Sequence, residues 1–328
     1  MPRFARWCSI LCVLLTVPTI VQAQSTYPDR PIRFVVAFPP GGATDTFFRM
    51  ISNELGTALG QAIVIENKGG AGGYIAWQAV AASPADGYTV LVAENALGIN
   101  QALFKKHPSG FNPLRDYDAV GAMASTPLVW TVANNIPPMT FKEFVEWSKT
   151  VAGNFNYGHA GPGSVSHLVP EVILDGTGMK AQAVPFKGGG PAAQAVAGGH
   201  VAAVASSLPV AKAQMEGKIV KGLFVTSNKR APSMPDVPAL NELGYKFADV
   251  DLQFWWGLFV PKDTPEPIRA KIEKALQTTM ANPAVRERLT RVDTDPSFAP
   301  GPALKVKLEN EIKNWSKFID DKGIKVEQ

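Results

Sequence analysis

Three glycine-rich segments stand between an expected strand and an expected helix, and their residue types suit an anion site. The first comprises Pro40, Gly41, Gly42, Ala43, Thr44 and Asp45. Glycine lets the backbone approach a ligand closely, and the free amides at a helix N-terminus carry partial positive charge. Thr44 or Asp45 is expected to cap this helix. A carboxylate is the expected guest, although an ordinary glycine turn before a capped helix explains the same residues equally well.

The second and third segments repeat this arrangement. Residues 158–167 contain Ser164 and Ser166, whose hydroxyls can donate and accept hydrogen bonds, and they end at His167, for which local packing or hydrogen bonding is expected. Residues 185–191 contain Phe186, Lys187 and Gly188. Lys187 could attract an anion, but a solvated lysine is the more common outcome.

Polar or aromatic residues follow or flank three further strands. Glu94 and Asn95 follow one strand and Ser206 and Ser207 follow another, and the carboxyl ends of parallel strands line a cleft. The run Phe254-Trp255-Trp256 precedes an apolar strand. Core packing explains most such runs, and the alternative is that one tryptophan, Trp255 among them, faces the cleft and covers an apolar part of the ligand.

Other chemistries are poorly supported. The sequence around Ser164 is not Gly-x-Ser-x-Gly, so a serine hydrolase using Ser164 or Ser166 with His167 is a weak alternative. The four histidines are not paired at metal-ligand spacing, and no nucleotide-binding glycine motif is present. We therefore expect no catalytic residues, no metal and no cofactor.

The N-terminus reads as an export signal that is removed. Arg3 and Arg6 precede an apolar stretch, and Val21-Gln22-Ala23 is a small-residue end, so residues 1–23 are expected to be cleaved after Ala23. A membrane anchor is the alternative, but the stretch is shorter than a bilayer requires. Cleavage would also remove Cys8 and Cys12, so the remaining chain would have no cysteine for a disulfide or a thiolate metal site. We expect a periplasmic protein.

The elements that must position these loops alternate along the chain. Residues 32–38, 62–66 and 88–93 have strand patterns, and segments of helical spacing lie between them. Such alternation predicts an α/β fold with mostly parallel sheets covered by helices. Further strands are expected near residues 119–124, 128–133, 155–158, 182–185, 201–205, 220–226 and 255–260.

The length of 328 residues favours two domains with a cleft between them. No linker separates the halves, so the chain is expected to cross between domains more than once. Domain 1 is assigned to residues 24–124 and 249–328, and domain 2 to residues 125–248.

Charge and helix-end signals complete the prediction. The net charge of +4 falls by two when Arg3 and Arg6 are removed, and like charges never run beyond two residues, which argues against nucleic acid. Thr140 and Glu143 form a capping-box pattern. Thr264-Pro265 and Asn282-Pro283 each place a capping side chain before a proline at the first helical position. A long helix is expected over residues 298–322.

Several ordered motifs resemble a known family. They include Pro40-Gly41-Gly42-Ala43-Thr44-Asp45, Ile65-Glu66-Asn67-Lys68-Gly69-Gly70, Ala85-Asp86-Gly87-Tyr88-Thr89, Ser164-x-Ser166-His167-Leu168, Pro185-Phe186-Lys187-Gly188 and Trp255-Trp256-Gly257-Leu258. The chain resembles the Bug, or tripartite tricarboxylate transporter receptor, family of periplasmic solute-binding proteins from Tyr27 to its final helix.

The resemblance implies a two-domain Venus-flytrap protein that is not an enzyme. It implies that the protein closes on a small carboxylated molecule and presents it to a membrane permease of the tripartite tricarboxylate type. It also implies that the ligand is held by Gly41, Gly42, Thr44 and Asp45 and by Ser164, Ser166 and His167. The working protein is expected to be a monomer.

One departure from the family pattern bears on the ligand. Many members carry an acid in the loop where this chain has Ser206-Ser207. Without this acid, an amino-acid ligand is less expected, because no carboxylate is present there to pair with its amino group. The expected ligand is a mono- or dicarboxylate without an amine. Aromatic acids of the phthalate type are included among the candidates. The alternative function is a ligand-loaded sensor that contacts a signalling partner.

Overall fold

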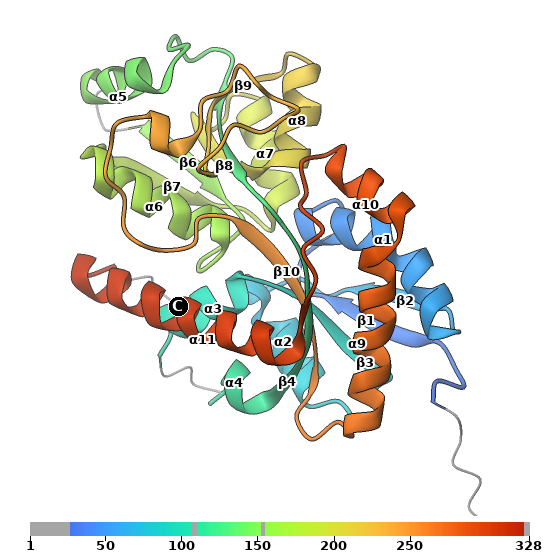
Figure 1. Ribbon diagram of the computed structural model, residues 1–328. Helices are drawn as coiled ribbons and strands as arrows, with labels where there is room; N and C mark the ends of the chain where they lie inside the picture. Colours follow the sequence, from blue (N-terminus) through green and yellow to red (C-terminus); the bar gives the residue numbers. More distant parts are fainter. Residues whose placement is uncertain (1–26, 106–109, 152–154, 325–328) are drawn as a thin grey trace, which may run out of the picture.

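Two β-sheets, each covered by helices, form two lobes of the molecule (Figure 1). The computed structural model describes residues 27–105, 110–151 and 155–324; the expected signal peptide and its cleavage site lie outside these ranges. The α/β fold class predicted from the alternating pattern is confirmed. The sheets are mixed and not mostly parallel as expected, because β4, β10 and β11 pair antiparallel in the first sheet and β5 does so in the second.

The first lobe contains a six-stranded sheet in the order β11-β4-β10-β3-β1-β2. Its strands are β1 (Ile32–Val36), β2 (Ile63–Asn67), β3 (Thr89–Glu94), β4 (Tyr117–Thr126), β10 (Phe254–Pro261) and β11 (Ala299–Pro300). Its helices are α1 (Ala43–Leu59), α2 (Tyr74–Ala81), α3 (Ala96–Leu103), α4 (Pro113–Asp116), α9 (Glu266–Ala281), α10 (Pro283–Thr290) and α11 (Gly301–Lys322). Helix α1 packs on α9 and α10, whereas α11 packs on α3 and β4.

The second lobe contains a five-stranded sheet in the order β7-β6-β8-β5-β9. Its strands are β5 (Leu128–Ala133), β6 (Phe155–His159), β7 (Ala181–Pro185), β8 (Ala203–Ser207) and β9 (Val220–Val225). Its helices are α5 (Phe141–Thr150), α6 (Val165–Thr177), α7 (Gly189–Ala197) and α8 (Leu208–Glu216).

The chain passes between the sheets at two places. It leaves the first sheet at Thr126 and enters the second at Leu128, and it returns between Val225 and Phe254. Strand β10 then inserts between β3 and β4, antiparallel to both. The boundaries expected from the sequence, at residues 124–125 and 248–249, fall near these crossings and stay our proposal for the domains.

Side-chain capping fixes the starts of α5 and α10. Thr140 accepts from the Glu143 amide at 3.2 Å and Glu143 accepts from the Thr140 amide at 3.1 Å, so the predicted capping box is present at α5. Asn282 caps α10 by accepting from Ala284 at 2.9 Å. The cap predicted at Thr264 is wrong, because its hydroxyl donates to the Pro261 carbonyl at 2.7 Å and α9 begins after Pro265.

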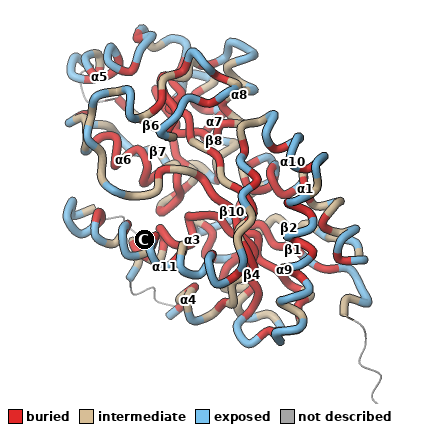
Figure 2. The backbone as a smooth tube through the Cα atoms, viewed as in Figure 1, coloured by how far each residue is buried: buried red, intermediate tan, exposed pale blue. Residues whose placement is uncertain are grey.

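The last helix starts later than its pattern predicts. Residues 299–300 pair with β4 as the short strand β11, so α11 begins at Gly301 instead of residue 298. Figure 2 shows that buried residues concentrate in the two sheets and on the helix faces against them. The sheets therefore act as rigid supports, and the loops at their ends are the parts available to a ligand.

Candidate functional site

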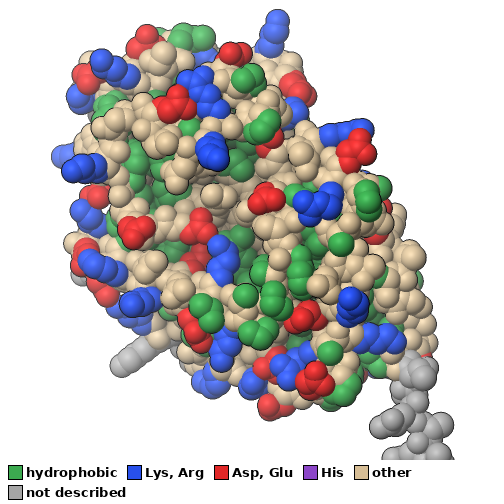
Figure 3. All heavy atoms as spheres, viewed as in Figure 1, with side chains coloured by type: hydrophobic (Ala, Val, Ile, Leu, Met, Phe, Trp, Pro, Cys, Tyr) green, Lys and Arg blue, Asp and Glu red, His purple; other side chains and the backbone are tan. Residues whose placement is uncertain are grey.

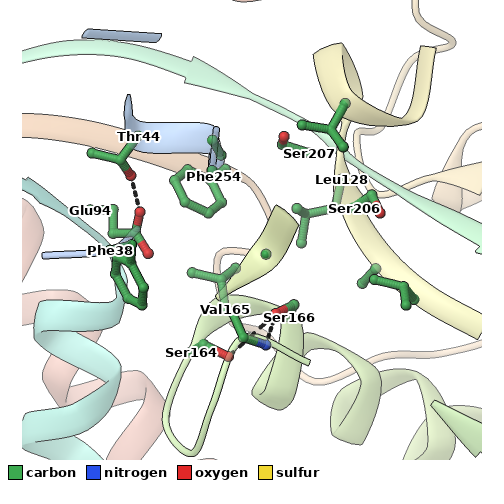
Figure 4. A pocket seen from close by; sticks show the side chains of 17 residues that line it. Phe38, Thr44, Glu94, Leu128, Ser164, Val165, Ser166, Ser206, Ser207 and Phe254 are labelled. Atoms are coloured by element: carbon green, nitrogen blue, oxygen red, sulfur yellow. Dashed lines mark hydrogen bonds between the residues drawn. The ribbon is translucent and has the colours of Figure 1, made fainter. Parts of the chain in front are cut away.

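A pocket of about 560 Å³, including its opening to solvent, lies between the two lobes (Figure 4). The first lobe contributes Phe38, Gly42, Ala43, Thr44, Glu94 and Phe254. The second contributes Leu128, Ala160, Ser164, Val165, Ser166, Gly189, Val204, Ala205, Ser206, Ser207 and Val210.

The start of α1 presents free backbone amides to this pocket. Gly42 is the N-cap residue and no side chain caps the helix. The amides of Ala43, Thr44 and Asp45 have no acceptor within the described residues. Free amides and the helix dipole together make a helix N-terminus attractive to an anion.

The cap predicted at Thr44 or Asp45 is wrong, because both side chains are engaged elsewhere. The Thr44 hydroxyl donates to the Glu94 carboxyl. Asp45 accepts from the Gly41 amide at 2.9 Å and from Arg49 at 3.0 Å. These bonds leave the α1 amides open to a ligand.

The start of α6 forms the opposite wall. The Ser164 and Ser166 hydroxyl oxygens lie 3.3 Å apart, and Ser166 also accepts from the Ala160 amide at 3.0 Å. The amides of Val165 and Ser166 have no acceptor within the described residues. This segment offers a second set of anion-binding donors.

His167 lies behind this wall and does not line the pocket. Its Nδ1 accepts from the Gly163 amide at 3.2 Å, and its ring stacks on His159 with 4.4 Å between centroids. Burial, with a smaller effect of His159, lowers the pKa of His167 to about 3. A neutral imidazole that accepts a backbone hydrogen bond shapes the loop, in agreement with the local hydrogen bonding expected from the residues. The resemblance implied that His167 also holds the ligand, but its side chain does not line the pocket.

Two more helices begin at the pocket. Gly189 is the first residue of α7, and Ser207 is the N-cap residue of α8. Ser206 is buried, and its hydroxyl has no hydrogen-bond partner in the described part of the chain. Four helix N-termini and an unpaired hydroxyl therefore surround a cavity whose lining contains no lysine, arginine or histidine among the described residues.

Several residues predicted for the site lie at its edge or behind it. Pro40 and Gly41 are exposed at the loop tip, and Asn95 is fully buried, with its side-chain amide donating to the Gln253 carbonyl at 3.0 Å. Neither these residues nor Asp45, which the resemblance implied as a ligand contact, lines the pocket.

The third glycine segment contributes only Gly189. Phe186 packs against the second lobe, where a Cβ on Gly158 would come within 3.1 Å of its ring, and Lys187 is exposed. Gly188 faces Pro39 across the cleft, with 3.1 Å between its ideal Cβ position and Pro39 Cδ. These residues border the closed cleft and do not reach the cavity.

Among the three consecutive aromatics of β10, the one that lines the pocket is Phe254. Trp255 is buried on the other face of the sheet, where its indole donates to both Glu311 oxygens at 3.1 Å. Trp256 packs on Phe47 with 4.1 Å between ring centroids and donates to the Thr44 hydroxyl at 3.1 Å. The sequence interpretation that Trp255 faces the cleft disagrees with this geometry, because side chains alternate across a strand.

Most of the apolar residues that line the pocket are not among the residues predicted for the site. Phe38 ends the first strand region immediately before the glycine loop, a position that could have marked it. The other missed residues are Leu128, Ala160, Val165, Gly189, Val204, Ala205, Val210 and Phe254. Ala160, Val165 and Gly189 lie inside two of the glycine-rich segments, and Phe254 belongs to the aromatic run. The remaining four have the types of ordinary core residues, so no local signal distinguishes them.

Residues 27–105, 110–151 and 155–324 contain neither a metal-binding cluster nor a membrane-spanning helix. There, no group of three or more histidine, aspartate or glutamate side chains is arranged to hold a metal ion. No helix in those ranges combines the length and apolar character needed to cross a membrane.

The chain is similar in sequence and structure to known periplasmic binding proteins. Residues 47–324 match the model of the tripartite tricarboxylate transporter family receptor. The periplasmic binding protein BugD is 31% identical, with a TM-score of 0.85 over 91% of this chain and 99% of that one.

Two similar structures contain a dicarboxylate. Rpa4515 of Rhodopseudomonas palustris, solved with adipate, is 28% identical, with a TM-score of 0.85 over 91% of this chain and 99% of that one. MatC of the same organism, with bound malate, is 32% identical, with a TM-score of 0.81 over 89% of this chain and all of that one.

Proposed function

The chain belongs to the tripartite tricarboxylate transporter receptor family of periplasmic solute-binding proteins, and from this premise we propose that its pocket captures a small organic carboxylate for a membrane permease. The observation that carries the proposal is the meeting of four helix N-termini at a pocket whose described lining residues include no basic side chain. Each N-terminus carries roughly half a positive charge.

The pocket lining supports a compact carboxylate with an apolar body. The rings of Phe38 and Phe254 flank the cavity, and the serine hydroxyls lie toward the second lobe (Figure 4). The related proteins solved with malate and adipate carry aliphatic dicarboxylates in the same fold. We propose a mono- or dicarboxylate as ligand, and the aromatic lining keeps phthalate-type acids in the set to be tested.

The working partner in this proposal is a permease of the tripartite tricarboxylate type. On the face shown in Figure 3, acidic and basic side chains are interspersed over both lobes without a large area of one sign. This surface gives no support for a nucleic-acid partner, which requires a clustered basic face. Export to the periplasm with cleavage after Ala23 and a monomeric state belong to the same proposal.

Calorimetry of the protein lacking residues 1–23 tests the carboxylate assignment. The panel contains malate, adipate, phthalate and aspartate, and adipamide serves as an uncharged control of adipate's length. We expect at least one carboxylate to bind with a Kd in the micromolar range and adipamide to show no binding. Equal binding of adipate and adipamide, or no binding by any acid, would contradict carboxylate capture.

A further inference from the structure

Glu94 is the one ionisable side chain among the described residues that line the pocket. It ends β3 opposite Trp256 of β10, and only 6% of its surface is exposed. Its Oε2 accepts from the Thr44 hydroxyl. Its Oε1 has no hydrogen-bond partner in the described residues and points away from Thr44, into the space beside Phe38 and Phe254 (Figure 4).

A hydrogen-bond relay holds Glu94 in this orientation. The Trp256 indole donates to Thr44 Oγ1 at 3.1 Å, so the single hydroxyl proton of Thr44 is left for Glu94. The Trp256 ring is itself fixed by stacking on Phe47 at an interplanar angle of 7°. In this arrangement the Thr44 hydroxyl proton is used by Glu94, and the carboxyl oxygen that is free to meet a ligand is Glu94 Oε1.

Among the described residues, no positive side chain compensates a charge on Glu94. On α1, Asp45 pairs with Arg49 and points to the Gly41 amide. Behind α6, burial lowers the pKa values of His159 and His167, which are neutral at pH 7. Glu311 lies on the far face of β10 with Trp255, and Lys212 of α8 bonds to the Arg291 carbonyl.

The protonation of Glu94 follows from these surroundings. Burial raises the pKa of Glu94 to about 8, and the hydrogen bond from Thr44 opposes this effect. A buried carboxylate without a counter-ion is strongly disfavoured, and a ligand anion nearby disfavours it further. The neutral acid has a proton to donate.

We propose that Glu94 binds the ligand as a neutral acid and donates a hydrogen bond from its free oxygen, so that the site favours molecules with an oxygen acceptor there, such as a second carboxylate, over molecules with an ammonium group. The inference rests on the proposed function and adds a specificity-determining residue to it. When Glu94 is ionised before binding, one proton from solvent enters the complex together with the ligand.

The Glu94→Gln variant separates the neutral donor from an anionic partner. Its side-chain oxygen can accept from Thr44 while its amide donates to the ligand, as protonated Glu94 would. The matched control is Glu146→Gln, which removes an exposed acid paired with Lys149 on α5. Binding of malate, adipate and aspartate is measured by calorimetry from about pH 6 to about pH 9.5, in buffers of different ionisation enthalpy.

For wild type and Glu146→Gln we expect the Kd of adipate or malate to rise by up to about tenfold per pH unit above the pKa of Glu94, with up to one proton taken up. For Glu94→Gln we expect a Kd within about threefold of wild type at pH 6 and little change with pH.

Two outcomes would overturn this inference alone. One is wild-type binding of a dicarboxylate that does not change with pH. The other is a loss of about a hundredfold in Glu94→Gln with aspartate as the best wild-type ligand, which would show an ionised Glu94 paired to an ammonium group. Silence of wild type and both variants toward every acid would overturn the proposed function and this inference with it.

Discussion

At the residue scale, Gly42 shows why the first glycine loop suits a ligand. Its φ of −75° is open to any residue, and a Cβ there would lie 3.4 Å from the Pro39 carbonyl oxygen, an ordinary contact. The position therefore does not need glycine for its backbone conformation. What a larger side chain would change is the space in front of the free α1 amides.

Gly42→Val is therefore expected to fold normally and lose carboxylate binding. We expect the Kd to rise by about a hundredfold or more, because the side chain would occupy the anion position. Thermal unfolding checks the fold and calorimetry checks binding. Thr57→Val places the same residue type at an exposed position near the other end of this helix and should bind like wild type. Normal affinity in Gly42→Val would remove the α1 start from the site.

The sequence shows residue types at the site better than it shows their directions. Gly42, Thr44, Glu94, Ser164 and Ser206 could be placed at the pocket because each follows a strand or opens a helix. The choice among Phe254, Trp255 and Trp256 depends on which sheet face each side chain takes. That choice is fixed by pairing with β3 and β4, which are far away in the chain.

At the element scale, α3 and the loop before α6 join the two lobes across the cleft. The Asn100 side-chain amide donates to the Gly163 carbonyl at 2.8 Å and to the Ala96 carbonyl at 3.0 Å, and the residue is buried. A Cβ on Gly163 would lie only 2.5 Å from Asn100 Oδ1. The approach of the two elements is thus too close for any larger residue at Gly163.

Asn100→Ala is expected to weaken ligand binding by favouring separation of the lobes. Loss of one cross-cleft hydrogen bond of about 1 kcal/mol should raise the Kd about fivefold, mainly through faster release. Stopped-flow tryptophan fluorescence measures the release rate.

Asn282→Ala is the control for this variant, because Asn282 caps α10 and the pocket lining does not include it. It should lower the free energy of unfolding by about 1 kcal/mol and leave the release rate unchanged. Equal release rates in Asn100→Ala and wild type would show that this contact does not hold the closed form.

The order of the elements could be predicted well, and their neighbours less well. Strand and helix patterns located the central strands of both sheets, since hydrophobic periodicity is a local property. The insertion of β10 between β3 and β4 is not local, and neither is the pairing that turns residues 299–300 into β11. Those arrangements depend on packing between segments that the sequence separates widely.

At the scale of the whole molecule, both ends of the described chain build the first lobe. β10 supplies the link between β3 and β4, so residues up to Thr126 cannot form the six-stranded sheet without the returning segment. Because no linker separates the halves of the sequence, the chain is expected to cross between the lobes more than once. The sequence alone does not predict how closely the two lobes approach each other.

Buried acids in the first lobe make overall stability depend on pH. Glu311 accepts from Trp255, and burial, followed by the nearby Asp251, raises its pKa well above the usual value. Because the folded-state pKa is raised, Glu311 stabilises the fold fully at pH values below its unfolded-state pKa, near 4.5. This stabilisation is lost as pH rises toward the folded-state pKa. The raised pKa of Glu94 likewise lowers the stability of the fold as pH rises.

Glu311→Gln is therefore expected to flatten the pH profile of stability. The wild-type free energy of unfolding should fall by up to about 1.4 kcal/mol per pH unit for each such acid as pH rises above about 5. The variant should lose less over the same interval. Urea unfolding at several pH values measures both slopes, with Glu146→Gln as the control, and identical slopes in the variant and wild type would contradict the assignment.

The part of the chain that the structure describes places no basic side chain in the pocket lining, and this affects how ligand binding responds to salt. Dissolved ions screen exposed charges over about 8 Å at physiological ionic strength, whereas enclosed dipoles are screened much less. A carboxylate held by helix amides should therefore bind with nearly the same affinity in dilute buffer and in concentrated sodium chloride. A binding protein built in this way can keep its ligand through osmotic changes that would weaken a site made from surface lysines and arginines.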